Sequence, residues 1–336
     1  MGEKTPQGTL KRGAGTLANR LSSARVFQQV AAFLSLILLV LFFSFASPHF
    51  FSVRNLVTIG LQTAVIGIMA MGVTYVIITA GIDLSIGSLL AVTGVVTALA
   101  IGAGAPIAIG VIAGAMSGLG IGLFNGFVVA FGKVPPFVVT LGMMMTGRGL
   151  ALVLTDGRPL YFREVPEFRL LAQTRVFDTV PLPVVYLFVV AIIAGFILKR
   201  SAIGRYIYAV GSNEEAARLS GVNVTKIKLF VYSFSGFMTG LAGVILAARL
   251  NSAQPAAGQT YELDAIAAAV IGGTSLMGGE GTITGTMVGA FIMSVLRNGL
   301  NLMGVSQFWQ QVIMGLVVSG AVFIDTLRKQ REAKAT

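Results

Sequence analysis

The residues in this sequence that could do chemistry are a few polar side chains set inside long apolar stretches. The chain has a single His, His49, and no Cys, so we expect no His-based metal site, disulfide or thiolate nucleophile. It carries no HExxH zinc motif, no GxSxG nucleophile turn and no Walker A loop. The stretch from Gly126 to Lys133 comes nearest to a Walker A loop but has one residue too many. We therefore expect no catalytic residue, and no metal or cofactor bound by this chain.

The first polar candidates lie in a glycine-rich interruption, GIDLSIGS, at residues 81–88. Asp83 and Ser85 stand there between two long apolar stretches. An ionisable group at membrane depth costs several kcal/mol, so it usually faces a cavity or a partner. The alternative is that Asp83 caps a short turn. The sequence leaves both interpretations open.

A second glycine-rich interruption, GGTSLMGGEG, covers residues 272–281. An offset of 191 residues aligns Gly81 with Gly272 and Gly87 with Gly278. Breaks at corresponding points of two halves often mark the pathway of a transporter. The match hints at a weak internal repeat.

The sequence also predicts one short capped helix in a basic loop. Ser212 to Glu215 resembles a capping box, with Ser212 as N-cap and Glu215 at the third helical position. Gly221 suits the left-handed residue that ends such a helix. The helix either lies at the surface or docks into a partner protein. Its predicted residues are Ser212, Asn213, Glu214, Glu215, Ala216, Ala217, Arg218, Leu219 and Gly221.

The elements that must position these residues are apolar spans. Hydrophobic residues make up 55% of the 336 and charged residues only 11%, against about 25% charged in soluble domains. Such a chain needs lipid as its solvent, so we predict an all-α polytopic membrane protein with about ten spans. The eighth is short enough to be re-entrant. The predicted spans are 27–46, 56–80, 86–103, 106–131, 137–154, 183–198, 226–248, 262–277, 283–303 and 308–326.

One predicted span carries a stripe of small residues. Glycines recur every four residues from Gly110 to Gly126, which places them on one helix face. Small residues let another backbone approach closely. The partner is either another helix of this chain or a second subunit.

Lys and Arg predict the orientation. Most of the 24 basic residues fall in segments that share one side of the membrane, which the positive-inside rule makes the cytoplasm. The net charge of +11 therefore reflects topology, not nucleic-acid binding. We expect a cytoplasmic tail at 1–26, a transmembrane domain at 27–326 and a second cytoplasmic tail at 327–336. Within the domain we expect a cytoplasmic segment at 204–225 and an external loop at 155–182. The basic stretch before the first span is too long for a signal peptide.

The chain resembles the permease subunit of ribose-type carbohydrate ABC importers, from about Phe50 to Phe323. Four stretches carry the resemblance. They are GIDLSIGSLLAVTG at 81–94, GRYIYAVGSNEEAARLSGVNVTKIK at 204–228, ARLNSAQPAAGQTYELDAIAAAVIGGTSLMGGEGTITGT at 248–286 and NGLNLMGVSQFWQQVI at 298–313.

The resemblance implies a monosaccharide substrate, with ribose first, and a bacterial inner-membrane location. It also implies a second permease copy, a cytoplasmic ATP-binding subunit that holds ATP and magnesium, and a periplasmic sugar-binding protein. The helix at 212–221 matches the segment that couples such permeases to their ATPase. A neutral sugar needs hydroxyl and amide partners along its pathway. The candidates are Asn125, Thr140, Gln254, Asn298 and Asn301, while Asp83, Ser85, Glu262 and Asp264 have uncertain roles.

Three alternatives stay open. The same machine could carry xylose, galactose, arabinose or a similar sugar. An ion-coupled secondary transporter would need intramembrane carboxylates, for which Asp83 and Asp264 are the candidates. A membrane-embedded enzyme would need a cluster of catalytic residues, which the sequence does not show.

Overall fold

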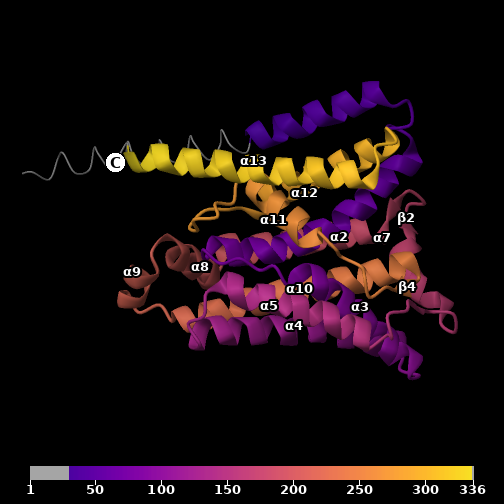
Figure 1. The fold of residues 1–336 in the computed structure, drawn as a ribbon, viewed down its shortest axis with the longest axis horizontal. Coiled ribbons are helices and arrows are strands. Elements are labelled where there is room, and N and C mark those ends of the chain that lie inside the picture. The colour runs from indigo at the N-terminus through magenta and orange to yellow at the C-terminus, as the bar shows by residue number, and fades with distance from the viewer. Residues whose placement is uncertain (1–29, 335–336) are drawn as a thin grey trace, which may run out of the picture.

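Residues 30–334 are described by a computed structural model, and most of them lie in helices that run roughly side by side (Figure 1). Within these residues, seven helices are long and apolar enough to cross a membrane. The helix Val30–Ala46 and α3 are apolar but shorter. The predicted all-α polytopic membrane fold is confirmed. The seven long helices are α2 (Val53–Ile78), α4 (Ile107–Phe131), α5 (Pro136–Val153), α7 (Leu182–Arg200), α10 (Val224–Leu250), α12 (Ile283–Leu302) and α13 (Gln307–Lys334).

The remaining elements are short and connect the long helices. The short helices are α3 (Ile86–Gly102), η1 (Pro166–Arg169), α6 (Leu170–Gln173), α8 (Ala202–Ser212), α9 (Glu214–Leu219) and α11 (Tyr261–Ile271). The strands are β1 (Leu160–Tyr161), β2 (Arg175–Val176), β3 (Val180–Pro181) and β4 (Ser252–Ala253). β1 pairs antiparallel with β4, Leu160 opposite Ala253, and β2 pairs antiparallel with β3. These two small ribbons tie the loops together at one end of the bundle.

One predicted span differs in the structure. The segment 262–277 does not form one membrane-crossing helix, because α11 ends at Ile271. Its 11 residues extend about 16 Å, roughly half of the hydrocarbon thickness. This length fits the re-entrant alternative. The predicted span 308–326 lies within α13, which continues through Lys334, and the boundary at 327 stays a prediction. The tail 1–26 and the first residues of the span 27–46 lie outside the described residues.

The centre of the bundle is built on α2 and α10, whose residues are largely buried. The glycine stripe of α4 packs against α10 and α3. A methyl group on Gly118 would collide with the carbonyl oxygen of Gly236, and one on Gly122 with that of Tyr232. The stripe therefore serves helix packing inside this chain, so the first of its two interpretations is confirmed. A methyl group on Gly120, which lies between these glycines in the sequence, would contact no other residue.

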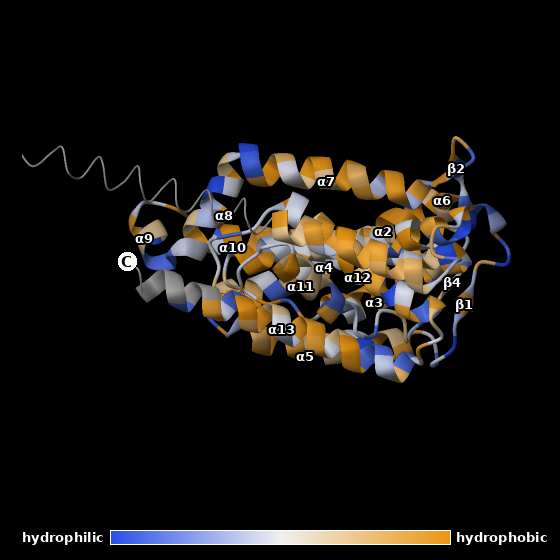
Figure 2. Ribbon diagram, turned by 90° about the horizontal axis from the view of Figure 1, so that it is seen from above, coloured by the Kyte–Doolittle hydropathy of each residue, from blue (hydrophilic) through white to orange (hydrophobic). Residues whose placement is uncertain are grey.

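The two ends of the bundle carry different features. α8 and α9 lie at one end, and the loops with β1, β2 and β4 lie at the other (Figure 2). The long helices between the two ends consist mainly of apolar residues, as expected for a surface in contact with lipid. Below we call these the α9 end and the β4 end. The segments 204–225 and 155–182 thus lie at opposite ends of the molecule.

Candidate functional site

The cap of α9 differs from the sequence prediction. Asn213 is the N-cap, and its side-chain Oδ1 accepts a 2.9 Å hydrogen bond from the backbone N–H of Ala216. Ser212 is the last residue of α8, and its hydroxyl donates to the carbonyl oxygen of Tyr208. The predicted capping box with Ser212 and Glu215 is therefore wrong. Asn caps a helix as well as Ser does. α8 therefore extends through Ser212, and the N-cap of α9 lies one position later than predicted, at Asn213.

The end of α9 follows the prediction. Gly221 has a φ of 85°, in the left-handed region. The N–H of Gly221 donates to the carbonyl oxygen of Arg218, and that of Val222 donates to the carbonyl oxygen of Ala217. These two bonds form a Schellman motif, which satisfies carbonyls that the helix leaves open. α9 is thus closed at both ends although it has only six residues.

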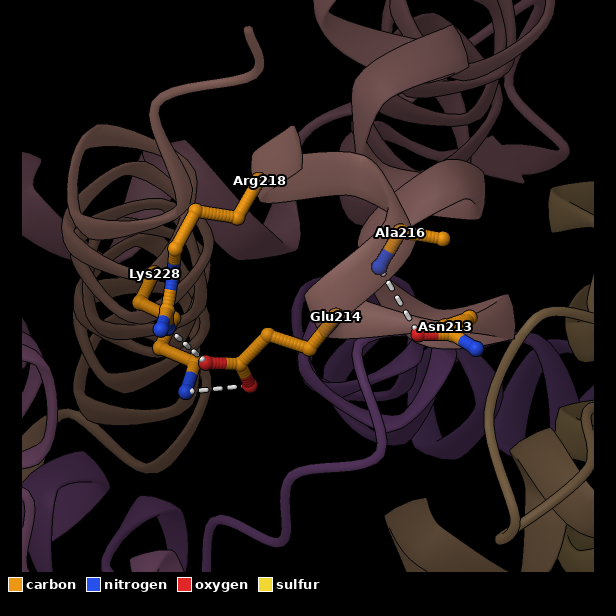
Figure 3. Close-up of polar contacts among 5 residues, drawn as sticks. All are labelled: Asn213, Glu214, Ala216, Arg218 and Lys228. Atoms are coloured by element: carbon orange, nitrogen blue, oxygen red, sulfur yellow. Dashed lines mark hydrogen bonds and ion pairs between the residues drawn. The ribbon is translucent and has the colours of Figure 1, made fainter. Parts of the chain in front are cut away.

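An ion-pair network fixes α9 to the long helix α10 (Figure 3). One carboxylate oxygen of Glu214 lies 2.9 Å from Arg218, and the other lies 2.8 Å from Lys228 on α10. Ala217 is buried, whereas Leu219 is 83% exposed. A large apolar side chain is therefore exposed on a helix that is fixed to α10. Burial of that side chain against another protein would be favourable.

α8 connects α9 to the glycine-rich loops at the same end. The hydroxyl of Tyr208 donates a 2.6 Å hydrogen bond to the carbonyl oxygen of Gly281. The N–H of Gly279 donates to the carbonyl oxygen of Ile78, at the end of α2. Gly211 packs between these two backbones so closely that a methyl group would collide with both. A push on α8 and α9 would therefore be passed directly to α2 and to the loop before α12.

The same contacts bring the second glycine-rich interruption, at 272–281, to the end of α2, a few residues before the first interruption at 81–88. The loop after α11 contacts the last residue of α2 through the bond from Gly279 to Ile78. The loops have different lengths, because α3 begins soon after Gly81 whereas α12 begins well after Gly272. The internal repeat stays a prediction.

Asp83 lies at the centre of a buried polar network. Its Oδ1 accepts hydrogen bonds from the N–H of Ser85 at 3.1 Å and from the hydroxyl of Ser85 at 2.6 Å. Its Oδ2 accepts a 3.0 Å bond from the hydroxyl of Ser235 on α10. The Nδ2 of Asn125 on α4 donates to the Ser85 hydroxyl oxygen. The carboxylate thus organises the turn before α3 and joins it to α4 and α10, which favours the turn-capping interpretation.

Of the five pathway candidates, three are buried and bonded to other helices or loops. Asn125 belongs to the Asp83 network, and the Thr140 hydroxyl lies within bonding distance of the carbonyl oxygens of Pro136 and Ile82. Asn298 donates a 2.8 Å bond to the amide oxygen of Asn55 and so joins α12 to α2. These contacts agree with bonding between elements of the fold.

The other two candidates are exposed. Asn301 lies in the last turn of α12, and Gln254 lies directly after β4, so both are at the β4 end. The Nε2 of Gln254 is 3.5 Å from the Ser252 hydroxyl oxygen. A pathway role for the five candidates stays a prediction.

Three charged side chains near the β4 end are paired or bonded to backbone. Asp264 on α11 forms a 2.5 Å ion pair with Arg297 on α12. Arg148 on α5 donates to the carbonyl oxygens of Pro255 and Ala257, at 2.8 and 2.7 Å. The carboxylate of Glu262 fills the space beside Gly87, where a methyl group would collide with it. Asp264 therefore has a fixed cationic partner, which a coupling carboxylate of an ion-driven transporter must release.

Sequence reasoning missed several partners in these networks. Ser235 and Asn55 were not singled out, because each lies in an apolar helix more than 100 residues from its partner. A polar residue inside an apolar span was the available signal, since such residues bond between helices. Among the described residues, no group of three or more His, Cys, Asp or Glu side chains could hold a metal ion.

These features define a multi-pass helical membrane protein with a short, exposed helix anchored at one end. Residues 55–324 match the family described as the permease component of branched-chain amino acid transport systems. The chain belongs to this permease family. No solved structure matches it.

Individual relatives are similar over nearly their whole length. The chain is 46% identical to the ribose import permease protein of Haemophilus influenzae, covering 88% of this chain and 92% of the relative. It is 42% identical to the ribose import permease protein of Bacillus subtilis, covering 92% and 96%. It is 36% identical to the xylose transport system permease protein of Escherichia coli, covering 91% and 93%.

Proposed function

We propose that this chain is the permease subunit of an ATP-driven importer that carries ribose across the bacterial inner membrane. The observation that carries the proposal is the similarity, along most of the chain, to permeases named for ribose import. The xylose permease is less similar, so xylose is the second candidate. The branched-chain amino acid in the family description is a weaker guide, because the individual relatives named above are sugar permeases.

In this proposal the chain itself hydrolyses nothing. ATP and magnesium bind to a separate cytoplasmic subunit, a second permease copy completes the passage, and a periplasmic protein delivers the sugar. Both termini lie in the cytoplasm, as the basic segments predict. The α9 end then faces the ATP-binding subunit, and the β4 end faces the periplasm with the loop 155–182.

α9 is the proposed docking element. Its residues Glu215 and Leu219 are exposed, whereas Glu214 is bound to Lys228 on α10. A helix that is fixed to α10 and joined through α8 to α2 transmits a displacement of the partner into the membrane domain. Access to the pathway would then alternate between two states whose populations the ATPase shifts.

The contacts of the carboxylates support ATP-driven import over ion coupling. Asp83 is held by three hydrogen bonds and Asp264 by an ion pair, all within the fold. A proton- or sodium-coupled mechanism needs a carboxylate that exchanges its ligand during the cycle.

The proposal is tested by ATP hydrolysis in a reconstituted complex. The permease, its ATP-binding subunit and its binding protein are placed in liposomes, and hydrolysis is measured with ribose, xylose, galactose and arabinose in turn. We expect ribose to stimulate most strongly. If another sugar stimulates more, the importer is retained and the substrate is replaced. If no sugar stimulates hydrolysis, the ATP-driven assignment fails.

A further inference from the structure

A polar cavity of about 260 Å³ opens at the β4 end. Its walls come from the loop before α11, from α11 and α12, and from the first turns of α13. We call it the outer polar pocket, and define it by Gln259, Tyr261, Arg297, Gln307, Gln310 and Gln311. None of these residues belongs to the networks that hold Asp83 or Asn298.

The glutamines of α13 present amides to this pocket at helical spacing. Gln307, Gln310 and Gln311 follow the i, i+3, i+4 pattern, so they share one face of the helix. Each amide both donates and accepts hydrogen bonds, as a sugar hydroxyl does. A wall of amides beside the aromatic ring of Tyr261 therefore suits a small polyhydroxylated ligand better than an apolar one.

The charge of the pocket favours a neutral ligand. Arg297 is its only charged lining residue, and the ion pair with Asp264 at 2.5 Å balances that guanidinium. The same guanidinium lies 5.7 Å from the centre of the Tyr261 ring, which holds both side chains in place. An amino acid zwitterion or an inorganic ion would find no unpaired charge here among the lining residues.

The volume of the outer polar pocket and its place in the fold also favour a monosaccharide. A volume of about 260 Å³ lies near the lower limit of small-molecule pockets, about 300 Å³, which suits a single monosaccharide. Two larger cavities are lined mainly by apolar side chains, such as Phe50 and Val184 in one and Phe188 and Phe196 in the other. α13 begins at Gln307 at the end opposite α9 (Figure 1).

We propose that the outer polar pocket is the site where the permease first receives its neutral monosaccharide from the periplasmic side. This inference rests on the proposed function and adds to it a site made of residues that the sequence did not single out. The site binds weakly, since a transported ligand must also leave. Its role is to hold the sugar by amide contacts while the passage below it opens.

The absence of Cys from the chain allows a direct test. The Gln311→Cys permease is assembled with its ATP-binding subunit and binding protein in right-side-out vesicles. Uptake of labelled ribose and ATP hydrolysis are measured before and after treatment with a bulky, neutral, membrane-impermeant thiol reagent. The Gln173→Cys permease is the matched control, because Gln173 is an exposed amide at the same end but outside the pocket. Each variant is compared with itself before and after labelling, so a folding defect caused by the substitution affects both measurements equally.

We expect the reagent to lower ribose uptake by the Gln311→Cys permease about tenfold, the loss of one or two hydrogen bonds with the sugar. Stimulated ATP hydrolysis, and ribose uptake by the Gln173→Cys control, should stay within about twofold, a difference too small to represent a lost hydrogen bond. A second variant, Ala256→Trp, fills the pocket without removing an amide and should lower uptake similarly. Unchanged uptake in the fully labelled Gln311→Cys permease would overturn the site. If vesicles import another sugar in place of ribose and labelling blocks that import, the site stands and only the ribose assignment falls.

Discussion

Leu219→Ala should weaken binding of the ATP-binding subunit without harming the permease itself. Leu219 is 83% exposed on α9, so its truncation removes almost no contact within the fold. Full burial of a Leu side chain stabilises by about 1.5–3 kcal/mol. Truncation to Ala removes most of the exposed side-chain surface. We therefore expect a loss of about 1–2 kcal/mol of docking free energy, or roughly a 5- to 30-fold weaker affinity. Leu219→Asp should weaken it further, because it places an unpaired charge in the interface.

The assay is a titration of purified permease with the ATP-binding subunit, with the dissociation constant as its readout. Leu170→Ala is the matched control, since Leu170 is also an exposed Leu on a short helix but lies at the β4 end. It should leave the affinity unchanged. Equal affinities for the wild type, Leu219→Ala and Leu170→Ala would refute the docking role of α9. A fall of similar size in both variants would show that truncation acts through the fold.

Three further predictions concern the cap of α9, the packing of α4 on α10 and the role of Asp83. Asn213→Ala should destabilise α9 by about 1 kcal/mol and so speed amide hydrogen exchange over residues 214–219. The control Ser212→Ala should leave that exchange unchanged. Equal exchange rates in the two variants would show that Asn213 is not the cap. Gly118→Val should lower the melting temperature in detergent sharply, because the side chain meets the Gly236 backbone, while Gly120→Val should stay within about 0.5 kcal/mol of wild type; equal melting of the two variants would contradict the α4–α10 packing. Asp83→Asn should keep ATP-driven uptake that a proton ionophore does not abolish, and ionophore-sensitive uptake in the wild type that the variant loses would instead support ion coupling.

The parts of the fold that depend on local pattern could be predicted from the sequence. Apolar runs placed the long helices, four-residue glycine spacing placed the face of α4 that packs on α10, and Gly221 marked the end of α9. Each is a property of neighbouring residues. The cap of α9 shows the limit of this reasoning. Ser212 and Asn213 are both good N-caps, and only the extension of α8 by one residue decided between them.

The parts that depend on tertiary contact could not be predicted. The sequence marked Asn298 as a pathway candidate, but it did not reveal the bond to Asn55, which lies on another helix 243 residues away in the sequence. The outer polar pocket is assembled from three helices and a loop, so no stretch of the sequence reveals it. The length of α11 was also hidden, because the apolar run continues through Met277 whereas the helix ends at Ile271. Composition alone does not show where a helix turns back.

ATP-dependent ribose uptake by the reconstituted complex tests the central claim most directly. Vesicles that contain the permease, its ATP-binding subunit and its binding protein are loaded with ATP or with a non-hydrolysable analogue, and accumulation of labelled ribose is followed with and without an ionophore. The account predicts accumulation that requires hydrolysable ATP and survives the collapse of the ion gradient. Accumulation that proceeds with the analogue and stops with the ionophore would contradict it.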